Sequence, residues 1–282
     1  MESLVNMLFH SSVLVIAKKE IRDSLRNRWV TFISLIFLLL SLSVTFAGSA
    51  VVGQLALPKL DALISSLSTI SVFIIPLAAM LVSYDAFIGE DESGTLLLLL
   101  SYPLSRFQIL SGKLIGHSVI MSFTISFAFG LTAVLLLIFG DNYDVAATVG
   151  QFSQFILTSI LLAITFILLG YIVSLKATEK AKAVATVLFV WFLFVLIYDL
   201  LLLTLLVADI SFFNQYIINV LIALNPTDLY RAINLIGTDA SKGSLATLSA
   251  SGWGKIALYL VMGLWVSGLM LVANFVFKRR QL

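Results

Sequence analysis

Long uninterrupted blocks of apolar residues dominate the pattern of this chain. Six stretches carry at most one acidic, basic or histidine side chain each, and each is long enough to cross a hydrocarbon layer of ~30 Å as a helix of about 20 residues. Because lipid offers no partners for unpaired backbone groups, each stretch must be helical. The pattern therefore predicts an all-α polytopic membrane protein with six transmembrane helices, within residues 29–58, 62–84, 114–140, 145–175, 183–208 and 256–277.

Composition agrees with a lipid-facing protein. Of the 282 residues, 60% are hydrophobic and 11% are charged, whereas a soluble domain carries about 25% charged residues. There is no cysteine, which excludes disulfides, thiolate metal sites and cysteine nucleophiles. No internal repeat interrupts the pattern, so we expect a single transmembrane domain over residues 1–282.

The distribution of basic residues predicts the orientation of the spans. All but four of the 17 lysines and arginines lie in the segments on one side of the six spans, and that side is expected to be cytoplasmic. Six spans also place both termini on this side, in the cytoplasm of a bacterial cell whose inner membrane holds the chain. The other side holds only Lys59, Arg231, Lys242 and Lys255.

The segment 13–28 is predicted to be an amphipathic helix that precedes the first span. Val13, Ile16, Ala17, Ile21 and Leu25 recur at helical spacing, and basic residues fill most of the opposite face. Such a helix is expected to lie on the cytoplasmic membrane surface. Asp85, where the second span ends, would be able to pair with its basic face.

The longest segment on the opposite side covers residues 209–254. Asn225 is placed to cap a helix whose first position is Pro226, and Asp228 and Arg231 are three residues apart, where helical side chains can pair. We expect this periplasmic helical segment to help form a platform for an outer partner, through Asn225, Pro226, Asp228 and Arg231.

Asp199 is an acid well inside the fifth predicted span. A carboxylate at that depth costs on the order of 3 kcal/mol on insertion scales, so it must face protein or water. One interpretation is a pathway residue of an ion- or proton-coupled secondary transporter. The other is an acid bonded to a neighbouring helix, which the sequence favours because a second deeply placed acid and repeat symmetry are both missing.

Several catalytic patterns are missing from the sequence. It contains no GxxxxGK[ST] phosphate loop, no HExxH pattern and no Gly-x-Ser-x-Gly pattern, and His10 and His117 are far apart. We therefore expect no enzymatic activity, no cofactor or metal bound by this chain, and no nucleic-acid partner. An intramembrane enzyme is disfavoured for the same reason.

Residues 89–113 form a predicted cytoplasmic loop with an unusual composition. Three acids precede Gly94 and Thr95, a run of five leucines follows, and Pro103 and Arg106 close the segment. Gly94 would allow a tight turn, Thr95 would cap a short apolar helix, and Pro103 would end it. A leucine-rich helix in water suits the groove of a partner protein.

This loop resembles the E-x-x-x-G-T-L-x-x-L-L-x-x-P-x-x-R motif of ABC-2 type permeases. Residues 17–29, 84–90 and 224–231 are similar to the branch of that family that serves maturation of nitrous oxide reductase. The resemblance implies a homodimer that docks two cytoplasmic ATPase subunits, which hold ATP and Mg, and a periplasmic β-helical accessory protein. It also implies a role in assembling a copper–sulfur centre. The ATPase-coupling residues would be Glu90, Gly94, Thr95, Leu96, Leu97, Leu100, Pro103 and Arg106.

Overall fold

The computed structural model describes residues 2–52, 57–140, 143–207, 215–235 and 254–280, and in these ranges it is helical and contains no strand. The predicted all-α class is therefore confirmed. The elements are α1 (Glu2–Arg26), α2 (Arg28–Val52), α3 (Leu60–Ser83), α4 (Asp85–Glu92), α5 (Thr95–Ser101), α6 (Arg106–Phe139), α7 (Val145–Lys176), α8 (Lys180–Phe192), the π-helix η1 (Leu193–Ile197), α9 (Tyr198–Val207), α10 (Gln215–Ala223), α11 (Pro226–Leu235) and α13 (Lys255–Arg279).

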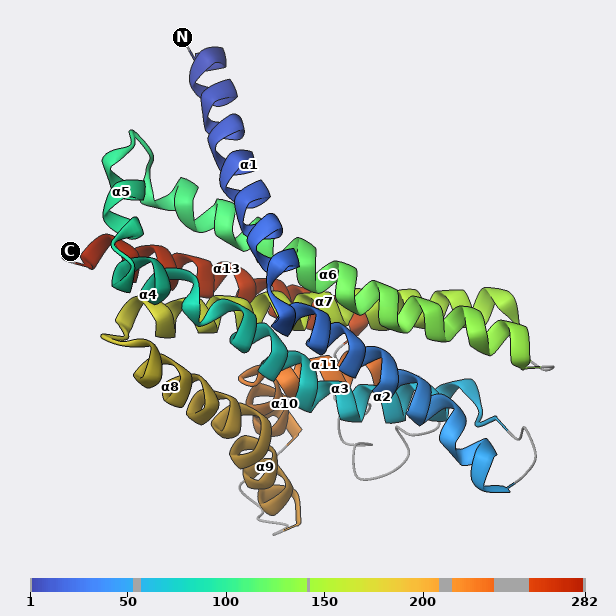
Figure 1. The fold of residues 1–282 in the computed structure, drawn as a ribbon. Helices are drawn as coiled ribbons and strands as arrows, with labels where there is room; N and C mark the ends of the chain where they lie inside the picture. The colour runs from blue at the N-terminus through green and yellow to red at the C-terminus, as the bar shows by residue number, and fades with distance from the viewer. Residues whose placement is uncertain (1, 53–56, 141–142, 208–214, 236–253, 281–282) are drawn as a thin grey trace.

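Five helical stretches are long and apolar enough to cross a membrane, and a sixth is obtained if the bent pair 12–26 and 30–46 is counted as one span. The five are 60–92, 106–139, 145–176, 180–205 and 255–279. Each overlaps one of the predicted spans 2 to 6 over most of its length, and α2 corresponds to the first. Figure 1 shows both termini at the same end of the bundle as α4 and α5, as an even number of crossings requires.

The helix α7 occupies the centre of the bundle and packs against α3, α6 and α13. Close approach of α3 and α7 depends on Gly170, because a β-carbon there would lie 2.0 Å from Ser83 Oγ. Two hydroxyl pairs join α2 to α6, one of them between Ser41 and Thr132 at 2.7 Å. Small residues and hydroxyl bonds are the usual means of helix association in lipid.

The helix α1 is longer than predicted and meets α2 at an angle of 70°. Val13, Ile16 and Ala17 of its expected apolar face are buried and α1 packs on α6 rather than on lipid. This packing is close because Gly112 and Gly116 of α6 leave no room for a β-carbon, which at Gly112 would lie 2.7 Å from Ile16 Cβ. α1 is thus joined firmly to the third span. The second half of the predicted apolar face of α1 is wrong, because Leu25 is 61% exposed while Glu20 and Ser24 are buried.

The fifth span is interrupted by the π-helix η1, and the following helices fold back into the bundle. The Asn225 side chain donates to the Phe194 carbonyl at 3.0 Å, and Trp265 Nε1 donates to the Ala223 carbonyl at 2.9 Å. Phe194 lies near the middle of the stretch 180–205. The turn between α10 and α11 therefore lies level with the middle of this stretch, and we call the pair α10–α11 the re-entrant hairpin.

Candidate functional site

The predicted coupling loop is two short helices at the end of the bundle that also holds the two termini. Gly94 has φ +71° and stands at the N-cap of α5, so the expected tight turn at glycine is confirmed. The prediction that Thr95 caps this helix is wrong, because Thr95 is its first residue and its hydroxyl donates to the Glu90 carbonyl at 3.2 Å. The helix ends at Ser101, two residues before Pro103, as predicted.

The leucine run divides into an inner and an outer face. Leu96 is completely buried and Leu100 is half-buried, so both anchor α5 to its own chain. Leu97, Leu98 and Tyr102 have exposed fractions of 59%, 65% and 64%. We call these last three residues the α5 apolar face. It is an apolar surface on a projection that the charge distribution places in the cytoplasm, and only this part of the run is available to a partner.

Arg106 begins α6 and points toward the end of α13. Its guanidinium donates to the Phe277 carbonyl and lies 5.5 Å from the centre of the Phe277 ring. Arg280, just beyond α13, pairs with Asp91 of α4 at 2.7 Å. Arg106 and Pro103 therefore position α5 between α4 and α6, and Arg106 makes its bonds within this chain.

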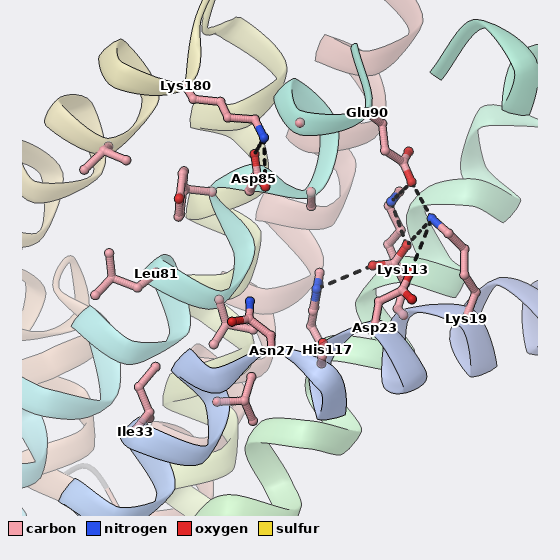
Figure 2. A pocket seen from close by; sticks show the side chains of 18 residues that line it. Lys19, Asp23, Asn27, Ile33, Leu81, Asp85, Glu90, Lys113, His117 and Lys180 are labelled. Carbon is pink, nitrogen blue, oxygen red and sulfur yellow. Dashed lines mark hydrogen bonds and ion pairs between the residues drawn. The ribbon is translucent and has the colours of Figure 1, made fainter. Parts of the chain in front are cut away.

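Behind this projection lies a group of charged side chains from three helices, Lys19 and Glu20 of α1, Glu90 of α4 and Lys113 of α6, which we call the ion cluster (Figure 2). Lys113 Nζ lies 2.8 Å from Glu20 Oε1 and 2.9 Å from Glu90 Oε1. Lys19 Nζ donates to the same Glu90 oxygen at 2.7 Å. The basic helix does pair with an acid of the loop, but with Glu90 rather than with Asp85.

The ion cluster extends into the bundle through His117. His117 Nε2 lies 3.6 Å from Glu20 Oε2, and His117 Nδ1 lies 2.6 Å from the hydroxyl of Tyr171 on α7. The contacts of the cluster therefore reach four helices, α1, α4, α6 and α7. His117 is 5% exposed, so it belongs to the buried interior of the bundle.

Burial makes the ion cluster electrostatically strong. The Lys113 side chain is 1% exposed and the Glu90 side chain 14%. Burial by itself raises the pKa of Glu20, but the charges of Lys113, His117 and Lys19 and the hydrogen bond from Lys113 together outweigh it, and the pKa is lowered from its ordinary value of 4.5. Removing one member of such a buried pair leaves an uncompensated charge and typically costs about 3–5 kcal/mol.

A cleft of about 490 Å³ opens beside the ion cluster, between α1, α3, α4 and α8. Figure 2 shows Lys180 and Asp85 on its far side, where Lys180 Nζ lies 3.1 Å from Asp85 Oδ1. Both acids and bases line the cleft. Among the residues that the structure describes, no group of three or more histidines and acids is arranged to hold a metal ion.

The residues predicted for the outer platform come together in the re-entrant hairpin. Asn225 Oδ1 accepts from Thr227 N at 3.1 Å, which confirms the predicted cap, and Arg231 lies 3.5 Å from Asp228, which confirms that pair. Asn225, Pro226, Asp228 and Arg231 are all buried. Since their side chains face the bundle, α11 does not present them to an outer partner directly. The sequence also predicts that Gly237 ends this helix, and that residue lies outside the described residues.

Asp199 bonds to a neighbouring helix, as the second of the two interpretations of this residue predicted. Its carboxylate accepts from Arg231 Nη1 at 2.5 Å. From the sequence we predicted that Arg231 pairs with Asp228 alone, and we did not identify Asp199 as its second acidic partner. A single acid engaged by an arginine offers little support for a proton-coupled pathway.

Sequence reasoning missed most of the ion cluster. Lys113 and His117 stand four residues apart near the start of an apolar helix, where they would share one face. That spacing was the feature of the sequence from which a polar site on this helix could have been predicted. Glu20 and Lys19 offered no such feature, since basic and acidic residues are mixed along 18–23.

Comparison with known proteins adds two findings to this geometry. The model of the family described as ABC-2 family transporter protein matches residues 14–282. A protein of Stutzerimonas stutzeri named probable ABC transporter permease protein NosY is 41% identical over 268 residues, which is 94% of this chain and 97% of the relative. A protein of the same name from Pseudomonas aeruginosa is 41% identical over 270 residues, covering 95% of this chain and 98% of the relative.

Proposed function

Because the chain belongs to the ABC-2 family of transporter permeases, we propose that it is the membrane subunit that couples ATP hydrolysis by a separate cytoplasmic ATPase to transport or signalling across the bacterial inner membrane. The sequence carries no nucleotide-binding loop. ATP and Mg would therefore bind to the partner ATPase, and this chain would supply the docking surface and the moving helices.

The α5 apolar face is the observation that carries this proposal. Leu97, Leu98 and Tyr102 are exposed on a short helix that is anchored behind by buried Leu96. Burying a leucine in a partner's groove contributes about 1.5–3 kcal/mol. Arg106 and Arg280 hold the flanking segments in place through α13 and α4, so the face is presented on a rigid support.

A second copy of the chain is the proposed neighbour of the membrane face formed by α3 and α9. Ser66 and Thr69 of α3 are exposed, and the Asp199 side chain is 41% exposed, at levels where a single chain would present them to lipid. Polar groups at such depths face protein or water. A homodimer with one ATPase for each copy would cover them.

The proposed biological role is assembly of the copper–sulfur centre of nitrous oxide reductase. Support comes from the motif of residues 89–106 and from the two NosY relatives. An outer β-helical accessory protein would receive the conformational change. The buried side chains of α11 would transmit it through the position of the re-entrant hairpin rather than by direct contact.

The test is to copurify the complex and measure ATPase binding and maturation of nitrous oxide reductase. Leu97→Asp should weaken ATPase binding by about tenfold or more, because 1.4 kcal/mol corresponds to a factor of ten. Thr178→Asp adds the same charge at an exposed position of the loop before α8 and should leave binding unchanged. Full binding by both Leu97→Asp and Leu98→Asp would place the docking surface elsewhere.

A further inference from the structure

Glu90 is not part of the α5 apolar face. Its carboxylate turns away from Leu97 and Leu98 and into the ion cluster, where two lysines lie within 2.9 Å of the same oxygen. Its side chain is 14% exposed. A residue held in this way does not offer its charge to a docking ATPase.

The two lysines come from different helices. Lys113 belongs to α6, which continues as the third span, and Lys19 belongs to α1. α1 is packed on α6 through Gly112 and Gly116 and leads, through Asn27, into α2 at an angle of 70°. A displacement of α4 can therefore be transmitted through two ion pairs. The pair with Lys113 leads into the third span, and the pair with Lys19 leads into α1, which continues into the first span.

We propose that Glu90, Lys113 and Lys19 form an internal joint that carries the movement of α4 and α5 to α1 and the first span. Glu90 acts as a positioning residue within this chain and makes no contact with the ATPase. The inference rests on the proposed function, because the ATPase must displace α5 for the joint to act.

Three features support transmission over simple anchoring. Charge-assisted hydrogen bonds are short and directional, so they resist sliding between α4 and α6. Lys113 bonds Glu20 and Glu90 at once, which ties α1 and α4 to one point. The described residues supply no hydrogen-bond donor to Glu90 Oε2, although that atom is buried, so among them both lysines hold the carboxylate through Oε1 alone.

The experiment follows the distance between α1 and the outer end of α7 in the assembled complex. Because the chain has no cysteine, spin labels can be placed on single cysteines at the exposed positions Arg22 and Ala146. Without substitutions in the joint, addition of ATP should shift this distance distribution. Lys113→Met and Lys19→Met should abolish the shift and the permease-dependent stimulation of ATP turnover, while ATPase binding stays at its original strength.

Two variants separate transmission from folding. Lys19 is half-exposed, so Lys19→Met tests the joint even where Lys113→Met fails to fold, and Lys19→Arg should restore the shift because it keeps the charge. Lys182→Met removes an exposed lysine on the same side and should change nothing. A normal ATP-dependent shift in Lys19→Met and in any folded Lys113→Met overturns the joint, as does the absence of a shift in the unsubstituted complex.

The outcomes also separate this inference from the proposed function. If the Leu97→Asp complex keeps its ATPase, the docking proposal fails whatever the joint variants do. If Leu97→Asp loses the ATPase and Lys19→Met keeps both the ATPase and the shift, the docking proposal stands and the joint fails.

Discussion

Arg231 of α11 donates to the carboxylate of Asp199 over 2.5 Å, and this ion pair joins the re-entrant hairpin to the outer half of the fifth span. Asp228 lies 3.5 Å from the same guanidinium. One arginine therefore serves two acids. The hairpin is further held by hydrogen bonds from Asn225 to the π-helix and from Trp265 to its turn.

Replacing Arg231 should destabilise the protein more than replacing Asp199. Arg231→Met leaves two acids without a cation, and breaking a buried pair costs on the order of 3–5 kcal/mol. Asp199→Asn keeps the pair between Arg231 and Asp228 and should cost less. Thermal unfolding in nanodiscs measures both, and equal losses in the two variants would contradict this account.

The close contact of α1 with α6 predicts the effect of small substitutions at glycine. In Gly112→Ala the new β-carbon meets Ile16 at 2.7 Å, so overpacking should cost about 1–3 kcal/mol, reduced by up to ~1 kcal/mol of helix propensity. Gly130→Ala is the matched control on the same helix, because nothing lies within 4 Å of its β-carbon. The control should be neutral or stabilising in the same unfolding measurement.

Gly94 tests the role of backbone conformation in presenting α5. Its φ of +71° disfavours other residues, yet nothing lies within 4 Å of an added β-carbon. Gly94→Ala should therefore cost about 1–2 kcal/mol of backbone strain without a clash and should weaken ATPase binding. Gly94→Asn should be milder, since asparagine tolerates the left-handed region. Identical binding by Gly94→Ala and the unsubstituted chain would argue against a fixed turn.

Stability should fall in acid through the ion cluster. The pKa of Glu20 is lowered in the folded protein, so its pairing contributes stability above the ordinary value of 4.5 and loses it as the pH falls through the lowered pKa. Glu20→Gln should be less stable at pH 7 and should lose part of this acid sensitivity. Glu179→Gln, at an exposed pair with Lys182, should keep the original pH profile.

The predicted orientation can be tested on α7 alone. Ala146 and Thr178 are exposed near its two ends. Single cysteines at these positions should react oppositely with an impermeant reagent on intact cells, with position 146 labelled and position 178 protected. Labelling of both would contradict the assignment that places the basic side in the cytoplasm.

The sequence by itself determined the class, the spans and the bounds of the short helix α5. Apolar blocks of about 20 residues have no alternative to helices in lipid. The short helix α5 is bounded by Gly94 before it and Pro103 after it, and both residues can be read from the sequence. The cap at Asn225 followed equally from local chemistry, because its partner is two residues away. All of these features depend on neighbours along the chain.

The tertiary structure alone decided which polar residues meet. Glu90 and Lys19 are 71 residues apart, and Asp199 and Arg231 are 32 apart, so no local pattern pairs them. The same holds for the re-entrant hairpin. An apolar segment is compatible with a surface helix or a buried one, and burial of α11 depends on the space between α3, α7 and α13, which helix packing creates.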